Sequence, residues 1–313
     1  MAQLTPSQAR IIDPVLSKYA LGYAMPGNVG RNLFPLAPVA MYGGQVIEFG
    51  KEAFRLYNTQ RAPGSATKRI QFGYQGKPYA IVPSALESVV PREIMQDASV
   101  VPGIDLATRS INTVLRNLML AHENTCGQLA RNAANYDANH LHTLTTGTNS
   151  WLVAGTNPSG DIETGKAAIR SSIGVYPNVA IISSKAMAAL RYHPAILDRV
   201  KYTSAGSITT EILANLWGIK TVLEGGAVVA TGAADAFGDV WGTDVILAYT
   251  AESESPNMEE PSYGYTYLME GHPLVEQPYW DPNSKGWVYG VSYDNTPVLS
   301  GITAGYLIQN AGT

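Results

Sequence analysis

One stretch of the sequence comes close to a loop that binds nucleotide phosphates. Residues 160–167 read GDIETGKA, which nearly matches GxxxxGK[S/T], where backbone amides and a lysine hold phosphate groups. Ala167 stands where the pattern needs a magnesium-binding hydroxyl, and Asp161 and Glu163 would place negative charge beside a phosphate. The simpler interpretation is a helix over residues 161–173 whose first turn is capped by Asp161. A nucleotide-dependent enzyme that uses the 160–166 loop is therefore only a remote alternative.

The histidines and the single cysteine could ligate a metal ion, but their spacing is incomplete. His122 and Cys126 lie one helical turn apart in HENTC, where a zinc protease would have two histidines and a third ligand. Both fall on the apolar stripe of a long helical pattern, which indicates core packing. His140 and His142 share one side of an extended segment, and no nearby carboxylate or cysteine completes a metal set.

No other pattern predicts catalysis. The nucleophile elbow G-x-S-x-G is absent, and His193 and His272 each precede a proline, which is typical of turns. The net charge of −4 and the lack of a recognition motif argue against sequence-specific nucleic-acid binding. We therefore expect no enzymatic activity, no catalytic residue, no cofactor and no metal.

The composition favours extensive contact with other protein surfaces. Charged residues make up 15% of the chain, against about 25% in typical soluble domains, while 45% of the residues are apolar. Basic residues dominate between positions 51 and 92, whereas residues 221–284 carry acidic side chains and no Lys or Arg. Unlike patches on one chain suit head-to-tail association of copies, although two unrelated solvated faces would look the same. The sequence predicts neither a secretory signal nor a membrane span.

Residues 43–82 predict a long hairpin that cannot fold alone. Its outgoing arm covers residues 45–57, its tip residues 58–68 and its return arm residues 69–82. Ile70, Phe72 and Tyr74 alternate with polar or small residues, which is the period of a half-buried strand. An isolated two-stranded hairpin is at most marginally stable in water, so another surface must support it. In a chain with few charges, we expect that surface to belong to another copy.

The elements on either side of the hairpin differ in regularity. Residues 1–42 predict a short helix over residues 9–20, followed by an arm in which prolines and glycines exclude regular structure. The arm is too apolar for a solvated tail, so we expect it to lie against a surface. After the hairpin, apolar residues at steps of three and four predict one amphipathic helix from the cap Asp105 to about Asn135.

The second half of the chain alternates short helices and strands and then becomes strand-rich. Helices are expected over residues 161–173, 184–191, 194–202 and 208–217. Strands are expected over residues 179–183, 220–223, 245–249, 263–269, 287–293 and 301–308. In residues 263–269 and 287–293 large side chains alternate with other residues, which is typical of strands.

This order of elements resembles that of the major capsid proteins of tailed bacteriophages, which share the Johnson fold. Residues 54–81 resemble the extended loop of one subgroup, and residues 84–98 resemble the lead into its spine helix. Residues 176–229 are similar to the core of its apical domain. The resemblance covers nearly the whole chain and rests on order, spacing and these blocks together, because no catalytic signature is involved.

The resemblance implies an α+β fold of the phage major capsid type. In that fold residues 1–42 are the N-terminal arm and residues 43–83 the extended loop. A peripheral domain comprises residues 84–170 and 250–313, with a spine helix over about 104–135. The apical domain comprises residues 171–249.

The resemblance also implies a structural protein that performs no chemistry. Copies would assemble through hexamers and pentamers into an icosahedral shell around phage double-stranded DNA, in the host cytoplasm, and would remain in the virion. Contact with DNA would be non-specific, and no membrane is involved. A separate scaffolding protein, a portal and a cement or decoration protein are left open. The alternative is an encapsulin-like compartment that uses the same fold to hold a cargo enzyme.

The candidate interface residues come from the hairpin and the acidic stretch. Aromatic and basic side chains of the loop are expected to meet acidic side chains of a neighbouring copy. These candidates are Phe54, Leu56, Tyr57, Arg61, Arg69, Phe72, Glu252, Glu254, Glu259 and Glu260.

Overall fold

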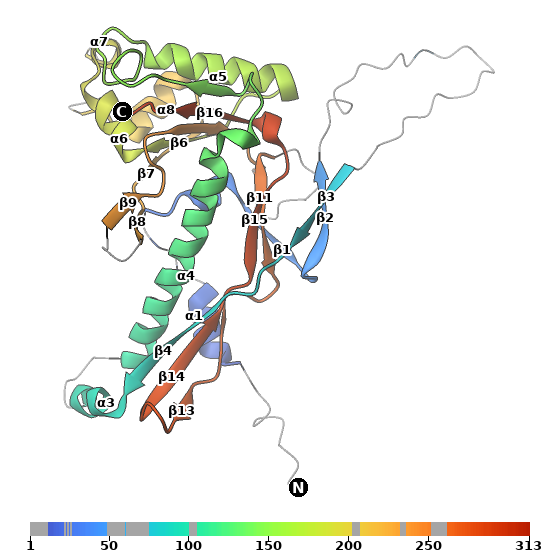
Figure 1. Cartoon of the computed structure of the whole chain (residues 1–313), viewed down its shortest axis with the longest axis vertical. Coiled ribbons are helices and arrows are strands. Elements are labelled where there is room, and N and C mark those ends of the chain that lie inside the picture. The colour runs from blue at the N-terminus through green and yellow to red at the C-terminus, as the bar shows by residue number, and fades with distance from the viewer. Residues whose placement is uncertain are drawn as a thin grey trace.

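A long helix, α4 (Leu106–Arg131), joins units at the two ends of the molecule (Figure 1). The computed structural model describes residues 12–21, 23, 25, 27–48, 60, 75–99, 105–201, 207–231, 236–251 and 262–313. The side chain of Asp105 accepts hydrogen bonds from Ala107 N and Thr108 N, so the predicted cap is confirmed. The helix ends at Arg131, and a separate 3-10 turn covers Ala133–Asn135, so the predicted end near residue 135 is slightly late.

The N-terminal half of α4 covers a sheet at the lower end of Figure 1. In this sheet β14 (Gly286–Ser292) lies between β4 (Ala85–Pro91) and the short strands β12 (Leu274–Val275) and β13 (Tyr279–Asp281). Helix α3 (Arg92–Ser99) continues β4, and α1 (Pro14–Leu21) packs beside β12. The buried side chains between sheet and helix are Val90, Ile111, Val114, Leu115, Val275, Tyr289 and Val291.

The middle of the molecule holds a three-stranded sheet that corrects the expectation of an irregular arm. Strand β1 (Leu36–Val39) pairs in parallel with β11 (Gly264–Met269), which pairs antiparallel with β15 (Asn295–Leu299). The short helix α2 (Gly30–Leu33) precedes β1. The arm therefore lies on its own body, and its backbone takes regular structure because buried amides and carbonyls need partners. Pro38 is tolerated because β1 is an edge strand.

Strand β11 confirms the strand expected over residues 263–269 and is covered on both faces. Residues 264–268 are all buried. Thr266 Oγ1 contacts His122 of α4 on one side, while Tyr265 and Tyr267 belong to a cluster with Ile81 on the other. A central strand between two covering layers has no solvated face, even where its residues alternate in size.

The upper unit of Figure 1 is built on a five-stranded mixed sheet in the order β5-β16-β10-β6-β7. Its strands are β5 (Leu141–Thr143), β6 (Val179–Ser183), β7 (Thr221–Gly225), β10 (Val245–Ala248) and β16 (Gly305–Gln309). The helices around it are α5 (Pro158–Ile173), α6 (Ser184–Tyr192), α7 (Pro194–Val200) and α8 (Thr210–Trp217). Strands β8 (Val228–Thr231) and β9 (Ala236–Asp239) form a separate pair. The sheet crosses the expected domain boundaries, since β5 and β16 come from outside residues 171–249.

The base of the expected hairpin is present. Strand β2 (Gly43–Glu48) pairs antiparallel with β3 (Gln75–Ala80), from Gly43 opposite Ala80 to Glu48 opposite Gln75. Figure 1 shows both strands beside the middle sheet, at the side of the molecule. The tip and the alternating residues 70–74 lie outside the described residues.

Candidate functional site

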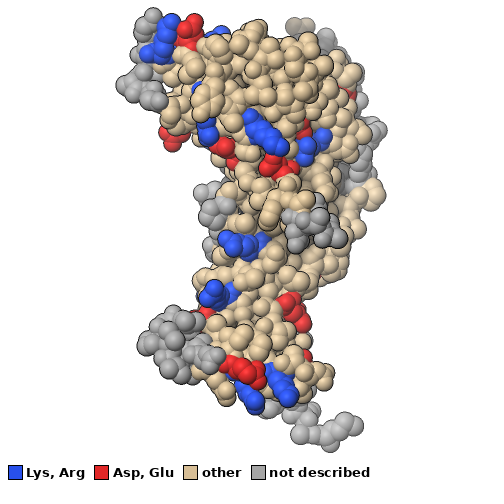
Figure 2. Space-filling model, turned by 60° about the vertical axis from the view of Figure 1, so that its left-hand side comes forward, with Lys and Arg blue, Asp and Glu red and all other residues tan. Residues whose placement is uncertain are grey.

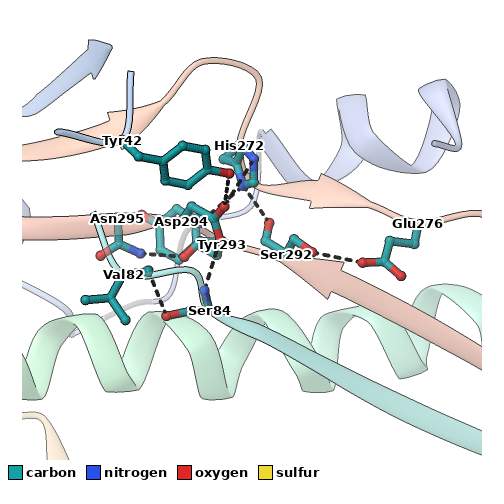
Figure 3. Close-up of polar contacts among 9 residues, drawn as sticks. All are labelled: Tyr42, Val82, Ser84, His272, Glu276, Ser292, Tyr293, Asp294 and Asn295. Atoms are coloured by element: carbon teal, nitrogen blue, oxygen red, sulfur yellow. Dashed lines mark hydrogen bonds and ion pairs between the residues drawn. The ribbon is translucent and has the colours of Figure 1, made fainter. Parts of the chain in front are cut away.

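The chain enters and leaves the hairpin at one buried carboxylate, Asp294 (Figure 3). Its Oδ2 accepts a hydrogen bond of 2.9 Å from the hydroxyl of Tyr42, directly before β2. Its Oδ1 accepts one of 2.9 Å from the backbone N–H of Ser84, shortly after β3. Because both partners bind one side chain of the body, the two ends of the hairpin are held together and fixed in direction.

Backbone hydrogen bonds reinforce the same junction. Tyr293 N donates to Ser84 O at 2.7 Å, and Ile81 N donates to Tyr42 O at 2.7 Å. The hydroxyl of Thr296 accepts from Val82 N at 3.2 Å. The base of the hairpin is therefore joined to the loop between β14 and β15 by several independent bonds.

His272 supports Asp294 from behind (Figure 3). Its Nδ1 lies 3.2 Å from Asp294 N and 3.2 Å from Ser292 O, and its Nε2 lies 3.9 Å from Asp294 Oδ2. An imidazole with its proton on Nε2 can accept from Asp294 N and face the carboxylate with that proton. Ser292 in turn donates to Glu276 Oε1 at 2.9 Å.

Two stacked tyrosines add an apolar contact at the hairpin base. The rings of Tyr79, on β3, and Tyr267, on β11, are nearly parallel with centroids 4.0 Å apart. Burial, and then the neighbouring Tyr79, raises the pKa of Tyr267 to about 12. The hydrogen bond to Asp294, followed by its charge, raises the pKa of Tyr42. Both phenols therefore stay neutral at physiological pH, and the arrangement is built to hold the hairpin rather than to react.

A second buried carboxylate, Glu123, holds the arm to the long helix. Its Oε1 accepts from Val29 N and Trp241 Nε1, and its Oε2 accepts from Gly30 N, each at 2.9 Å. A Cβ on Gly30 would lie 2.8 Å from Glu123 Oε2, so this close approach requires glycine. Glu123 thus joins α2, α4 and the loop after β9 that carries Trp241.

The phosphate-loop motif is part of a helix. Residues 160–166 lie inside α5, which starts at Pro158 with Asn157 as its N-cap. The expected cap, Asp161, instead accepts from Trp151 Nε1 at 2.8 Å. Asn157-Pro158 was the overlooked signal, because proline is favoured in the first helical turn after an Asn cap.

The glycine and lysine of that motif have packing roles. A Cβ at Gly165 would lie 2.7 Å from Leu247 Cδ1, so helix α5 approaches β10 closely there. Lys166 Nζ lies 2.8 Å from Glu163 Oε1 and also donates to Trp217 O. Backbone amides in a helix interior already donate within the helix, which leaves none to hold a phosphate.

The expected core role of His122 and Cys126 is confirmed. Both are buried, His122 Nε2 lies 3.1 Å from Thr266 Oγ1, and Cys126 Sγ lies 3.6 Å from His122 Nε2. Burial, with a smaller contribution from Arg31, lowers the pKa of His122 to about 4. Burial raises the pKa of the Cys126 thiol, which makes a thiolate ligand unfavourable.

The other histidines differ in part from expectation. His193 links α6 to α7 and accepts from Ala195 N, which fits the predicted turn. Carboxylates do lie near the other pair: His140 Nδ1 is 2.7 Å from Asp137 Oδ1, and His142 Nδ1 is 3.8 Å from Asp161 Oδ1. The sequence pattern named no carboxylate partner for either histidine, whereas Asp137 reaches His140 through a tight turn.

The described ranges also bear on metal sites and on membrane-spanning helices. Within these ranges, no three His, Cys, Asp or Glu side chains gather as a metal site would require. The helices in the same ranges include none that is long and apolar enough to cross a membrane.

The ten candidate interface residues all lie outside the described residues. They remain a prediction. Sequence reasoning missed Asp294, Ser84 and Tyr42, because a buried carboxylate in a loop has the same local pattern as an ordinary turn residue. It also missed Glu123. The available signal was that Glu123 is the acidic residue among the mainly apolar residues on the buried face of α4.

Comparison with known proteins identifies the fold and the family. No family model matches the chain. The major capsid protein of Burkholderia phage BcepMu is 32% identical over 306 residues, which cover 97% of each chain. The crystal structure of a phage-related protein from Bordetella bronchiseptica RB50 is 57% identical, with a TM-score of 0.85 over 97% of this chain and 99% of that chain.

A more distant structure shows the fold alone. The putative capsid protein of a prophage from E. coli CFT073 is 11% identical, with a TM-score of 0.57 over 96% of this chain and 99% of that chain. The arm, the paired base of the hairpin, the long helix and the α/β unit thus define a protein of the phage capsid fold. The sequence match over nearly the full length takes the assignment further: the chain belongs to the family of phage major capsid proteins.

The expected resemblance, fold class and shell role are therefore confirmed. The protein is a structural component of a capsid shell, and its relatives are structural proteins of virions. The encapsulin-like alternative is less well supported, because the full-length sequence match is to a capsid protein.

Proposed function

We propose that copies of this chain assemble through hexamers and pentamers into an icosahedral shell that encloses phage double-stranded DNA. The observation that carries the proposal is the anchored base of the hairpin. Among the described residues, β2 and β3 pair only with each other, while Asp294 holds both of their ends to the body. A hairpin whose base is fixed to the body in this way is suited to reach a neighbouring copy, because an isolated two-stranded hairpin needs a further surface to be stable.

The hairpin would lie across the adjacent subunit. Its loop residues Phe54, Leu56, Tyr57 and Phe72 would supply apolar contact, and Arg61 and Arg69 would meet acidic side chains of residues 252–260. The low charge of the chain supports this arrangement, and Figure 2 shows one face on which uncharged residues predominate. Several modest contacts with several neighbours would together exceed a standard interface in area.

The α/β unit and the peripheral domain would make different contacts within the shell. The α/β unit of residues 171–249, extended by β5, α5 and β16, would face the centre of each capsomer. Residues 84–170 and 250–313 would otherwise form the peripheral domain around α4. DNA would be contacted without sequence specificity, and assembly would take place in the host cytoplasm. A scaffolding protein, a portal and a cement or decoration protein are left open as further partners, and the protein itself would catalyse no reaction.

Removal of the hairpin tip tests the proposal. A variant that lacks Thr59–Lys68 should fold, because Asp294 and the β2–β3 pairing lie outside the deletion, but it should form few closed shells. A matched control replaces the same ten positions with a Gly/Ser linker, which restores the length without the side chains. Electron microscopy gives particle yield and guanidinium unfolding gives subunit stability. Normal shells from the deletion variant would show that the hairpin does not join copies.

The contents of the particles separate a capsid from a cargo compartment. Particles isolated from phage-producing cells should contain nuclease-protected double-stranded DNA of uniform length. A stoichiometric cargo protein in place of DNA would favour the encapsulin-like alternative.

A further inference from the structure

Two tryptophans at the lower end of the molecule are only partly covered by the residues that the structure describes. Trp280 on β13 and Trp287 on β14 face each other in the antiparallel register. They are 40% and 37% exposed, and their rings meet edge to face with centroids 5.9 Å apart. The other three tryptophans of the chain, Trp151, Trp217 and Trp241, are fully or almost fully buried.

The pair continues the buried face of the lower sheet beyond its helix. Trp287 stands opposite Val90, so both side chains share the face that packs on α4. On that face Val291 and Tyr289 of β14 and Val90 of β4 are buried, whereas Trp287 beyond them is partly exposed. Leu86 of β4, opposite Val291, is also exposed. The apolar face of the sheet is therefore longer than the cover that α4 provides. Ile94, on α3 directly after β4, is half exposed at the same end.

The charges around the pair are balanced, which narrows the choice of partner. Arg92 and Lys285 carry positive charge, and Glu93 and Asp281 carry negative charge. Lys285 O accepts from Arg92 N at 3.0 Å, which brings the turn after β13 against the start of α3. Figure 2 shows blue and red side by side at the lower end. A polyanion such as DNA would find no net positive charge there, whereas a surface of both signs can complement a copy of itself.

We propose that the tryptophan pair Trp280–Trp287 is a contact between copies of this chain, in which the tip of one lower sheet packs on the tip of another. The inference rests on the proposed shell function, which supplies the second copy. Tryptophans are enriched among residues that dominate binding energy, and an edge-to-face pair is already ordered before binding. The tip lies at the extreme end of the long axis, away from the α/β unit, so two tips can meet without collision of the larger units (Figure 1).

Fluorescence quenching by acrylamide tests this contact on the unmodified chain. In dissociated subunits, Trp280 and Trp287 should account for the accessible emission, which the double variant W280F/W287F identifies by difference. In shells formed from this chain alone, that accessible fraction should fall to near zero. Shells of this chain in which both tryptophans remain accessible would overturn the proposal. The same holds if the tryptophans become protected only after a second protein is added to those shells.

Substitution of both tryptophans provides a second, independent test of the contact. W280T/W287T keeps strand-favouring residues but removes the aromatic surface, and it should raise the concentration needed for assembly by at least about tenfold. W280F/W287F keeps an apolar pair and should assemble close to the parent concentration. Assembly of the threonine variant at the parent concentration contradicts the contact. If the threonine variant does not fold, quenching of the unmodified chain decides. Absence of any shells from the parent chain counts against the shell function, whereas shells with exposed tryptophans count against this contact alone.

Discussion

At the scale of single residues, buried polar side chains tie together segments that are distant in sequence. Asp294 joins the two ends of the hairpin, and Glu123 joins the arm, the long helix and the loop of Trp241. Each carboxylate has both oxygens occupied by hydrogen bonds, which is the condition for keeping such a group buried. Sequence analysis placed His122 in the core because of its spacing on the helix, but it could not identify Thr266 as its partner, 144 positions away.

His122 makes the stability of the subunit depend on pH. Its folded pKa of about 4 lies below the ordinary value of 6.5, so the folded state resists a proton that the unfolded state accepts. Its contribution is fully present above pH 6.5 and is lost as the pH falls toward 4. Between pH 7 and pH 4.5 we expect this residue to lower the unfolding free energy by about 2–3 kcal/mol.

The comparison of His122→Gln with the parent chain isolates that contribution. Denaturant unfolding of dissociated subunits at both pH values should show a smaller decrease for the variant, because glutamine does not titrate. Other groups titrate equally in both proteins and cancel. Equal decreases in the two proteins would show that His122 is not the source.

At the scale of elements, the periodicity of apolar residues predicted those helices and strands whose formation depends on local sequence. The long helix and the strands β6 and β10 were placed well, because their apolar patterns are strong and uninterrupted. Strand β4 was missed: its pairing with β14 joins residues about 200 positions apart, so register and burial come from tertiary contact. Strand β1 was missed because Pro35 and Pro38 outweighed its apolar residues in the sequence pattern.

The attachment of α2 to α4 should depend on Glu123. In Glu123→Gln the amide nitrogen cannot accept a hydrogen bond, so at least one of the three donors loses its partner. We expect the variant to lose about 1–3 kcal/mol of unfolding free energy. Hydrogen exchange at the amides of Val29 and Gly30 should also become faster. Gln128→Ala, at an exposed position of the same helix, serves as the control, and equal effects of the two substitutions would contradict this role.

At the scale of the whole molecule, α4 connects the lower sheet to the upper α/β unit. Its N-terminal half packs on the lower sheet, and at its C-terminal end Arg131 Nε binds buried Asp244 Oδ2 of the upper unit at 2.7 Å. The hairpin leaves from the sheet between them (Figure 1). The composition indicated early that such a chain needs other copies, because 15% charged residues leave much uncharged surface. The sequence could not locate those contacts, since an interface between copies leaves no periodic pattern.

The central claim is that copies of this chain join one another through the hairpin to build a shell. The most direct measurement is sedimentation velocity of the purified chain over a range of concentrations, with electron cryomicroscopy of the fastest fraction. We expect capsomers or closed particles that form above a threshold concentration, with the hairpin of each subunit lying on its neighbour. A single monomeric species at every concentration, with residues 45–82 folded onto their own body, would contradict the account.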